Sequence, residues 1–413
     1  MFLVDHAKPR LIKQWKKLLN SFTNILRYID DFIYSLLKKD SNINVLLIVR
    51  NSISISVFLP LIREFKNRKN IDITITEEYK GCYAWPQHGE VAELKRLHFK
   101  EPSKCIFLKW HYIFVTDIST IWFKRHHIKV SVSHGWAYNI GLKSKAATTV
   151  ADSYNYLQDF SSYPIDLYFH NSTYDFSVIR ELLPSTNKSL HVVSGFCKAD
   201  SFALSESLNS EKSALSKPKQ NKNINIVLTS HFRKESLLQH FGIEVINTIM
   251  HCRENISLVV LGHAVLWRNN EALFQQIKAL AEKNNKIVFL PDLGDNTPIL
   301  ESANVFIGDY SSIFFEFCII DKPILRFEHP QFEFGNIEIG DAYRDASMTF
   351  TKLSEIPNLI EQAIQLPSLQ SSSRQNVVKK FVPNIGDASK IIADTLEQLG
   401  PLTNRNQING KAP

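Results

Sequence analysis

One stretch decides the fold: Ala303-Asn-Val-Phe-Ile-Gly-Asp-Tyr-Ser-Ser-Ile-Phe-Phe-Glu-Phe-Cys318. Its first apolar run is β-branched and aromatic, which is typical of a buried parallel strand, and its second run predicts a helix. Ser311 or Ser312 can cap that helix. The free N–H groups and positive dipole end at such a helix start form a site for a phosphate or pyrophosphate. The pattern suits equally a core helix that is merely capped by Asp309 and the serines.

Predicted strands and helices alternate on both sides of this stretch, which indicates an α/β protein. Strands are expected at 44–49, 71–76, 105–108, 112–115, 128–133, 167–169 and 190–193, and then at 224–229, 256–261, 287–290, 305–307 and 323–327. Helical patterns lie between them, and three more at 355–365, 373–381 and 389–399 close the chain. This order predicts two doubly wound, Rossmann-like sheets facing a cleft.

The predicted domains follow from these patterns. The first Rossmann-like domain covers residues 41–202, and the second covers 224–400. Between them, 203–223 is polar and rich in Ser, Lys and Asn, which is typical of a linker. Residues 401–413 are predicted to form a loose tail.

Composition narrows the class of protein without selecting a function. A chain of 413 residues with 44% hydrophobic and 22% charged residues is ordinary for a globular protein. The net charge of +7 favours an anionic partner, but nucleic acid, nucleotide, phosphopolymer and membrane surface all remain open. The five cysteines lack Cys-x-x-Cys spacing and are predicted to be reduced. Without a signal core or an apolar run of about 18 residues, we expect a cytoplasmic protein.

Residues 1–40 form a basic amphipathic segment. Apolar residues recur at helical spacing from Leu11 to Leu37, and cationic residues crowd its beginning. Such a helix can lie on an anionic inner leaflet with Trp15 at the interface, which predicts a peripheral protein on the inner face of the cell membrane. A helix docked on the protein's own core, or a dimer contact, fits the same pattern.

Polar side chains follow four predicted strands, where ligands of open α/β sheets collect. These positions are His134-Gly135, Ser230–Arg233, Gly262-His263 and Gly308–Ser312. Each histidine alone is also consistent with a structural role. Their convergence predicts one site, in which His134 faces the other three groups across the cleft.

At these positions the chain resembles the CDP-glycerol glycerophosphotransferase family, which extends teichoic acids and related capsule polymers. His134-Gly135 is similar to the family's His-Gly motif, and Gly195–Asp200 is similar to its Gly-Tyr-Pro-Arg-Asn-Asp segment. Phe232-Arg233 resembles its aromatic-Arg pair, and His263 falls where the family has His-Pro. The most specific match is Asp309–Glu316, followed by Lys322-Pro323-Ile324. The resemblance covers about residues 130 to 330.

This resemblance implies the two-domain fold called GT-B and an enzyme that takes an alditol phosphate from a CDP-alditol and releases CMP. His134 and His263 are the implied catalytic residues, with His134 as general base. With His263, the implied pyrophosphate ligands are Arg233, Ser311 and Ser312, while Asp309 orients the turn or a ligand hydroxyl. The implied supporting residues are Gly135, Lys198, Asp200 and Glu316.

The resemblance also assigns partners. The N-terminal domain is the implied acceptor domain and the C-terminal domain the nucleotide-donor domain. The expected acceptor is a phosphopolymer or glycolipid, beside an anionic membrane surface and without nucleic acid. No tightly bound cofactor is expected, and the need for a divalent metal is open. Asp292, Asp295 and Glu301 are irregularly spaced around prolines, so we predict no metal site there.

The chain departs from the family pattern mainly on the acceptor side. After His134-Gly135 it has Trp136–Ile140 where the family carries Thr-Pro and a lysine pair, and Lys143 and Lys145 lie downstream. His263 precedes Ala264 instead of proline. Three functions therefore stay open: transfer from CDP-glycerol or CDP-ribitol, a GT-B glycosyltransferase for capsule or lipopolysaccharide synthesis, and a non-catalytic polyanion-binding assembly protein.

Overall fold

The computed structural model describes residue 25 and residues 42–87, 89–106, 108–116, 127–133, 135, 142–144, 165–182, 188–203, 223–291, 295–334 and 337–402. The predictions for His134, Asp292, nearly all of segment 1–40, most of linker 203–223 and most of the tail 401–413 therefore lie outside the described residues.

The first sheet is six-stranded and parallel, in the order β2-β1-β3-β4-β6-β7. Its strands are β1 (Ile43–Val49), β2 (Ile71–Glu77), β3 (Tyr112–Val115), β4 (Ile128–Val132), β6 (Leu167–His170) and β7 (Leu190–Val193). Its helices are α2 (Ser52–Lys66), α3 (Glu90–His98), α4 (Pro102–Cys105), α6 (Thr173–Leu182) and the 3-10 turn η2 (Cys197–Ala199). We call this sheet with its helices the first lobe.

One strand prediction in the first lobe is wrong. The segment 105–108 was expected to be a strand, but Cys105 ends helix α4 and Leu108 lies in a bend. Pro102 stands at the first positions of this helix, where its fixed φ and missing N–H favour a helix start.

The second sheet is also six-stranded and parallel, in the order β10-β9-β8-β11-β12-β14. Its strands are β8 (Ile224–Leu228), β9 (Ile256–Leu261), β10 (Ile287–Leu290), β11 (Val305–Gly308), β12 (Ile324–Phe327) and β14 (Met348–Phe350). Its helices are α8 (Leu237–Phe241), α9 (Glu244–Cys252), α10 (Ala264–Asn269), α11 (Glu271–Lys283), α12 (Thr297–Ser302), α13 (Ile313–Ile320), α14 (Ile337–Asp345), η3 (Leu353–Glu355) and α15 (Ile356–Gln365). This is the Rossmann strand order, and we call this sheet with its helices the second lobe.

The stretch that opened the sequence analysis folds as predicted. Every residue of β11 is buried, and residues 313–318 of α13 are buried on all sides of the helix. Phe314 stacks on Tyr343 of α14 at a ring distance of 3.9 Å. Core packing on all sides therefore anchors the loop between β11 and α13.

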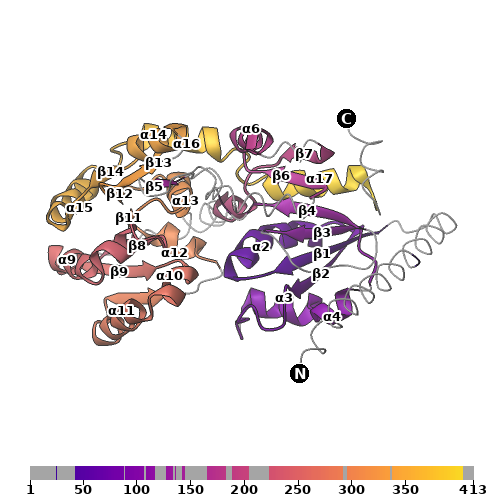
Figure 1. The fold of residues 1–413 in the computed structure, drawn as a ribbon, viewed down its shortest axis with the longest axis horizontal. Coiled ribbons are helices and arrows are strands. Elements are labelled where there is room, and N and C mark those ends of the chain that lie inside the picture. The colour runs from indigo at the N-terminus through magenta and orange to yellow at the C-terminus, as the bar shows by residue number, and fades with distance from the viewer. Residues whose placement is uncertain are drawn as a thin grey trace, which may run out of the picture.

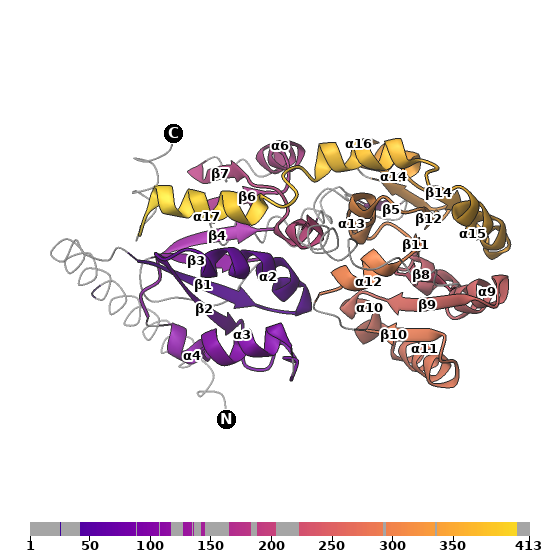
Figure 2. The ribbon, with the colours of Figure 1, turned by 180° about the vertical axis from the view of Figure 1, so that it is seen from behind.

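Figures 1 and 2 show the two lobes at opposite ends of the molecule, and several described elements connect them. Strand β5 (Leu142–Ser144) pairs antiparallel with β13 (Phe332–Phe334). Helix α16 (Ser371–Phe381) contacts both α13 and α6. The last helix, α17 (Ala388–Leu399), lies against α2 and η2 of the first lobe. The domain bounds from the sequence placed this helix in the second domain; those bounds stay a prediction.

Within the described part of the chain, no helix combines the length and the apolar character needed to cross a membrane. All five cysteines are free thiols.

Candidate active site

Two loops meet where the strand order of the second sheet reverses. Strands β8 and β11 are neighbours, with Leu228 opposite Ile307, and their carboxyl ends lead into residues 229–236 and 309–312. Ligands of Rossmann-like sheets bind in the crevice at this switch point. Predicted site residues Arg233, Asp309, Ser311 and Ser312 all belong to these two loops.

Asp309 ties the two loops together. Its side chain is buried, and Oδ2 accepts hydrogen bonds from Ser230 Oγ at 2.9 Å and from Leu237 N at 3.0 Å. The backbone N–H of His231 lies 3.1 Å from both carboxylate oxygens. Burial raises the pKa of Asp309, and these hydrogen bonds act in the opposite direction. Since protein donors occupy both oxygens, the geometry favours the orienting role over a direct contact with phosphate.

His231 is a site neighbour that sequence reasoning did not select. Its ring stacks on Phe232 at 4.1 Å and lies 5.9 Å from the ring of His263. Burial, with the nearby His263 and Arg233, lowers the pKa of His231 to about 3, so the imidazole is neutral. The sequence did place His231 in the strand-end segment Ser230–Arg233, but only Arg233 of that segment was predicted to be a site residue.

His263 stands at the N-cap of α10. Its Nδ1 accepts a hydrogen bond from Val265 N at 3.1 Å, and its ring lies 4.8 Å from Phe232. With Nδ1 as acceptor, the neutral imidazole carries its proton on Nε2. His263 can therefore present an N–H donor to an anion.

The two serines stand at the beginning of α13. Ser312 is the N-cap residue, as predicted, but its side chain makes no capping hydrogen bond. The Ser311 carbonyl accepts a hydrogen bond from Tyr343 Oη at 3.0 Å, which fixes the backbone of this turn. Both residues are partly exposed.

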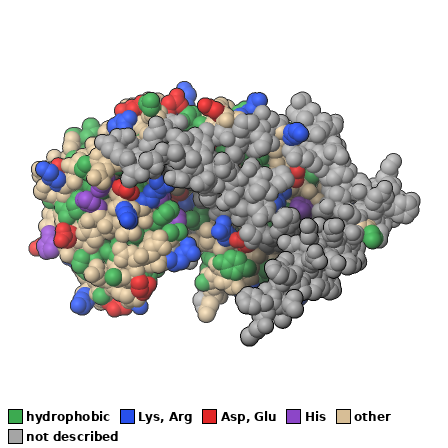
Figure 3. Space-filling model, viewed as in Figure 1, with side chains coloured by type: hydrophobic (Ala, Val, Ile, Leu, Met, Phe, Trp, Pro, Cys, Tyr) green, Lys and Arg blue, Asp and Glu red, His purple; other side chains and the backbone are tan. Residues whose placement is uncertain are grey.

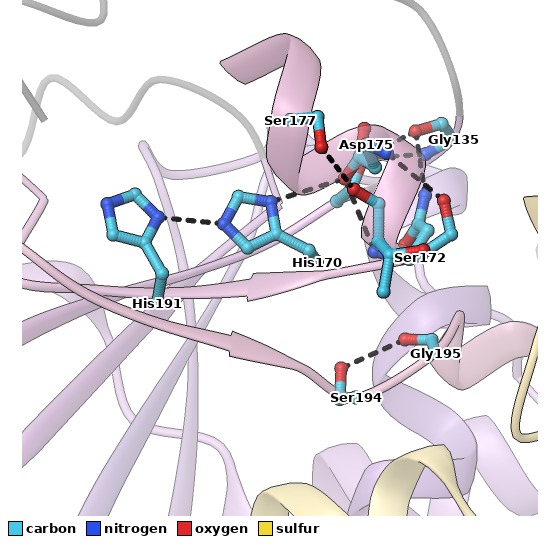
Figure 4. Close-up of polar contacts among 11 residues, drawn as sticks. Gly135, His170, Ser172, Asp175, Ser177, His191, Ser194 and Gly195 are labelled. Carbon is cyan, nitrogen blue, oxygen red and sulfur yellow. Dashed lines mark hydrogen bonds and ion pairs between the residues drawn. The ribbon is translucent and has the colours of Figure 1, made fainter. Parts of the chain in front are cut away.

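Gly135 follows the end of β4 in the first lobe and lies close to Ser312. A Cβ placed on Gly135 would lie 3.2 Å from Ser312 Oγ. The Gly135 carbonyl accepts hydrogen bonds from Asn171 Nδ2 at 3.1 Å and from Ser133 Oγ. Figure 4 shows Gly135 next to Asp175 and Ser172, with His170 and His191 leading away from it. The residue that follows His134 in the chain thus lies close to the loop 309–312, which we call the phosphate-site loop after its predicted role.

Among the predicted supporting residues, Lys198 and Glu316 join the two lobes, and Asp200 holds the start of α17. Lys198 Nζ of η2 lies 2.6 Å from Glu316 Oε2 of α13, and both side chains are buried. Asp200 accepts hydrogen bonds from the backbone of Gly386 at 2.8 Å and Ser389 at 2.8 Å, at the start of α17. Figure 3 shows the outline of the molecule indented at its lower edge between the lobes, with cationic side chains nearby.

Among the described residues, no group of three or more His, Cys, Asp or Glu side chains could hold a metal ion. Asp295 instead accepts a hydrogen bond from Thr297 N at 3.0 Å, and Asp292 lies outside the described residues. The need for a divalent metal stays open.

Solved structures share this fold, and three of them illustrate the likeness. The wall teichoic acid polymerase TagF has a TM-score of 0.59 at 14% identity, with 96% of this chain and 98% of that chain covered. MnaA of S. aureus, solved with UDP, has a TM-score of 0.54 at 15% identity, with coverage of 86% and 96%. A UDP-N-acetylglucosamine 2-epimerase has a TM-score of 0.52 at 15% identity, with coverage of 86% and 96%. At these identities the likeness shows the fold alone, and it confirms the predicted GT-B-like arrangement.

The sequence itself matches a family. No curated protein matches the sequence. A family model described as CDP-glycerol:poly(glycerophosphate) glycerophosphotransferase matches residues 112–336. This match includes every predicted site residue from His134 to Glu316. Since it spans more than half of the 413 residues, the chain belongs to the CDP-glycerol:poly(glycerophosphate) glycerophosphotransferase family, a family of transferases.

Proposed function

We propose that this protein transfers glycerol phosphate or ribitol phosphate from a CDP-alditol to a hydroxyl of a cell-surface polymer or of its lipid-linked precursor, and releases CMP. The observation that carries the proposal is the close approach of Gly135 to Ser312 across the two lobes, where a Cβ on Gly135 would lie 3.2 Å from Ser312 Oγ. It joins the acceptor motif to the phosphate-site loop of a chain whose family is defined by this chemistry.

The second lobe binds the pyrophosphate of the donor in this proposal. His263 donates from Nε2, the guanidinium of Arg233 supplies positive charge, and the hydroxyls of Ser311 and Ser312 donate from the start of α13. Asp309 holds the loops that carry these groups. The neutral ring of His231 packs on Phe232 and lies beside His263, and it adds no charge to the site.

The transfer is a substitution at the phosphorus that bears the alditol. The acceptor oxygen forms a bond to this phosphorus, and the bond between the phosphorus and the oxygen bridging to CMP breaks. The electron pair of the broken bond stays on CMP, whose charge the second-lobe donors stabilise. His134 takes the proton of the acceptor hydroxyl.

The proposed acceptor is a teichoic acid or a related phosphopolymer. The structural neighbour TagF is a wall teichoic acid polymerase, and one of its structures was determined after a soak with CDPG. Cationic residues displaced downstream of the acceptor motif, Lys143 and Lys145, suit an anionic polymer.

A donor screen tests this function. The purified protein is incubated with CDP-glycerol, CDP-ribitol, CMP-sugars and UDP-sugars, with and without a phosphopolymer acceptor, and the nucleotide products are separated by chromatography. We expect acceptor-dependent CMP release from a CDP-alditol and a new phosphodiester in the polymer. Turnover of a nucleotide sugar alone would replace the proposed chemistry with glycosyl transfer.

Variants then test the assigned residues. We expect His134→Ala and His263→Ala each to lower the transfer rate by about a hundredfold or more while leaving the circular dichroism spectrum unchanged. His251→Ala, on the exposed face of α9, is the matched control and is expected to keep the wild-type rate. A near-normal rate in either test variant would remove that histidine from the mechanism.

We also propose that the basic segment 1–40 holds the enzyme at the inner face of the membrane, where a lipid-linked acceptor is assembled. Replacing Lys16 and Lys17 with Glu should weaken binding to vesicles that contain anionic lipid. Replacing Lys278 and Lys283 of α11 with Glu changes the net charge equally and should leave vesicle binding unchanged. Equal binding by both variants would contradict this attachment.

A further inference from the structure

Tyr310 is a buried phenol in the middle of the phosphate-site loop. Its side chain is 2% exposed, and its hydroxyl has no hydrogen-bond partner in the described part of the chain. Leaving a buried hydroxyl unpaired costs stability, and the few such groups in native proteins require an explanation.

Two other buried phenols of the described chain have hydrogen-bond partners in the protein. Tyr112 Oη donates to the Gly400 carbonyl at 2.6 Å, and Tyr343 Oη donates to the carbonyl of Ser311 at 3.0 Å. Burial of a tyrosine in this fold therefore does not by itself leave its hydroxyl unpaired.

The ring of Tyr310 is held in place on two sides. It stacks on Phe332 at 4.1 Å with an interplanar angle of 11°, and it lies 5.1 Å from the ring of His231. Tyr343 Oη also lies 3.3 Å from the Tyr310 carbonyl. A ring packed in this way presents its hydroxyl in one place.

The surroundings of the hydroxyl keep it protonated. Burial raises the pKa of Tyr310, as do Asp309 and Glu235, while Arg233 acts in the opposite direction, so the phenol stays neutral and keeps its proton. A neutral O–H is a hydrogen-bond donor, and a phosphate oxygen is a strong acceptor for it.

We propose that the Tyr310 hydroxyl also binds the nucleotide substrate, by donating a hydrogen bond to one of its phosphate oxygens. This inference rests on the proposed function, because that function supplies the pyrophosphate. The ligand then satisfies the hydroxyl that the protein leaves unpaired, and the cost in stability of the free enzyme is recovered on binding.

Tyr310→Phe separates this role from a structural one. The variant keeps the ring and its stacking on Phe332 and removes only the hydroxyl. Since that hydroxyl has no partner in the protein, the free variant should melt at the wild-type temperature or above it. Its affinity for CDP should fall about tenfold or more, because a hydrogen bond to a charged phosphate is lost. Its affinity for cytidine, which lacks phosphate, should not change.

Tyr112→Phe is the matched control, because it removes a hydroxyl that has a partner in the protein. We expect it to lower the melting temperature and to bind CDP as the wild type does. Calorimetric titration of the full-length proteins with CDP and with cytidine, beside thermal melts, gives all of these values. If Tyr310→Phe bound CDP as tightly as the wild type, or melted as early as Tyr112→Phe, the inference would be wrong. If the wild type itself failed to bind CDP, the proposed function would fall, and the inference with it.

Discussion

The fold determines the charge of His231. Its position two residues before Arg233 is visible in the sequence, but its neutrality is not, because it arises from burial against Phe232, His263 and Tyr310. Asp309 illustrates the same limit. The residue was singled out from its motif, yet its partners Ser230 and Leu237 lie more than seventy residues away and could not be predicted.

This neutrality predicts how stability depends on pH. The pKa of His231 falls from 6.5 to about 3 on folding, so the unfolded chain binds the extra proton between these values. His231 therefore does not reduce the free energy of unfolding above pH 6.5. As the pH falls from 6.5 toward 3, the free energy of unfolding decreases by at most about 1.4 kcal/mol per pH unit. Urea unfolding at pH 7.5 and at pH 5 should therefore show a smaller loss for His231→Asn than for the wild type.

The exposed His251 supplies the control for this experiment. His251→Asn should lose stability between the two pH values as the wild type does. The same loss in His231→Asn and in His251→Asn would show that His231 does not carry the effect.

Among the elements, the long patterns were predictable and the short ones were not. The β11–α13 unit was predicted because its two apolar runs are continuous and divided by one polar turn. Strands β5, β13 and β14 have three residues each, which is too short for a period to show in the sequence. The incorrect strand at 105–108 shows the same ambiguity of short apolar runs.

The link between β6 and the end of β4 predicts an effect at the element scale. Asn171 is buried, donates to the Gly135 carbonyl, and has its own N–H 3.3 Å from Asp175 Oδ2. In Asn171→Asp the shape is kept, but a carboxylate faces the carbonyl oxygen. We expect hydrogen exchange around Gly135 to rise and the transfer rate to fall about tenfold or more, with CDP affinity unchanged.

Ser177→Ala, which changes an exposed hydrogen bond on the same α6 helix, should alter neither quantity. Faster exchange with a normal transfer rate would show that the position of Gly135 does not limit transfer.

For the molecule as a whole, the sequence predicted two Rossmann-like sheets but not how they are joined. The buried pair Lys198–Glu316 spans 118 residues of sequence, and Arg68 Nη1 meets Glu397 Oε2 at 2.8 Å across 329. Contacts between residues so far apart along the chain leave no local pattern in the sequence. The resemblance marked Lys198, Asp200 and Glu316 as supporting residues, and the structure places Lys198 and Glu316 between the lobes.

Breaking the pair on one side should destabilise the protein strongly. Lys198→Met or Glu316→Gln leaves the other group buried without its partner, and each should lower the free energy of unfolding by about 3–5 kcal/mol. The double variant should recover part of this loss. Asp341→Asn, which breaks the exposed pair with Arg344, should cost less than about 1 kcal/mol. Chemical denaturation measures all four, and equal costs for the buried and exposed pairs would refute the expectation.

The return of α17 to the first lobe has a consequence for the order of folding during synthesis. Leu396 and Ile392 are buried on this helix, which covers α2 more than three hundred residues earlier in the chain. Domains generally fold as they leave the ribosome, N-terminal first, but here the first lobe lacks one of its covering helices until residues 388–399 emerge. The first lobe to be translated is thus the last to be completed, and its uncovered apolar face is exposed to chaperones while the second lobe is made.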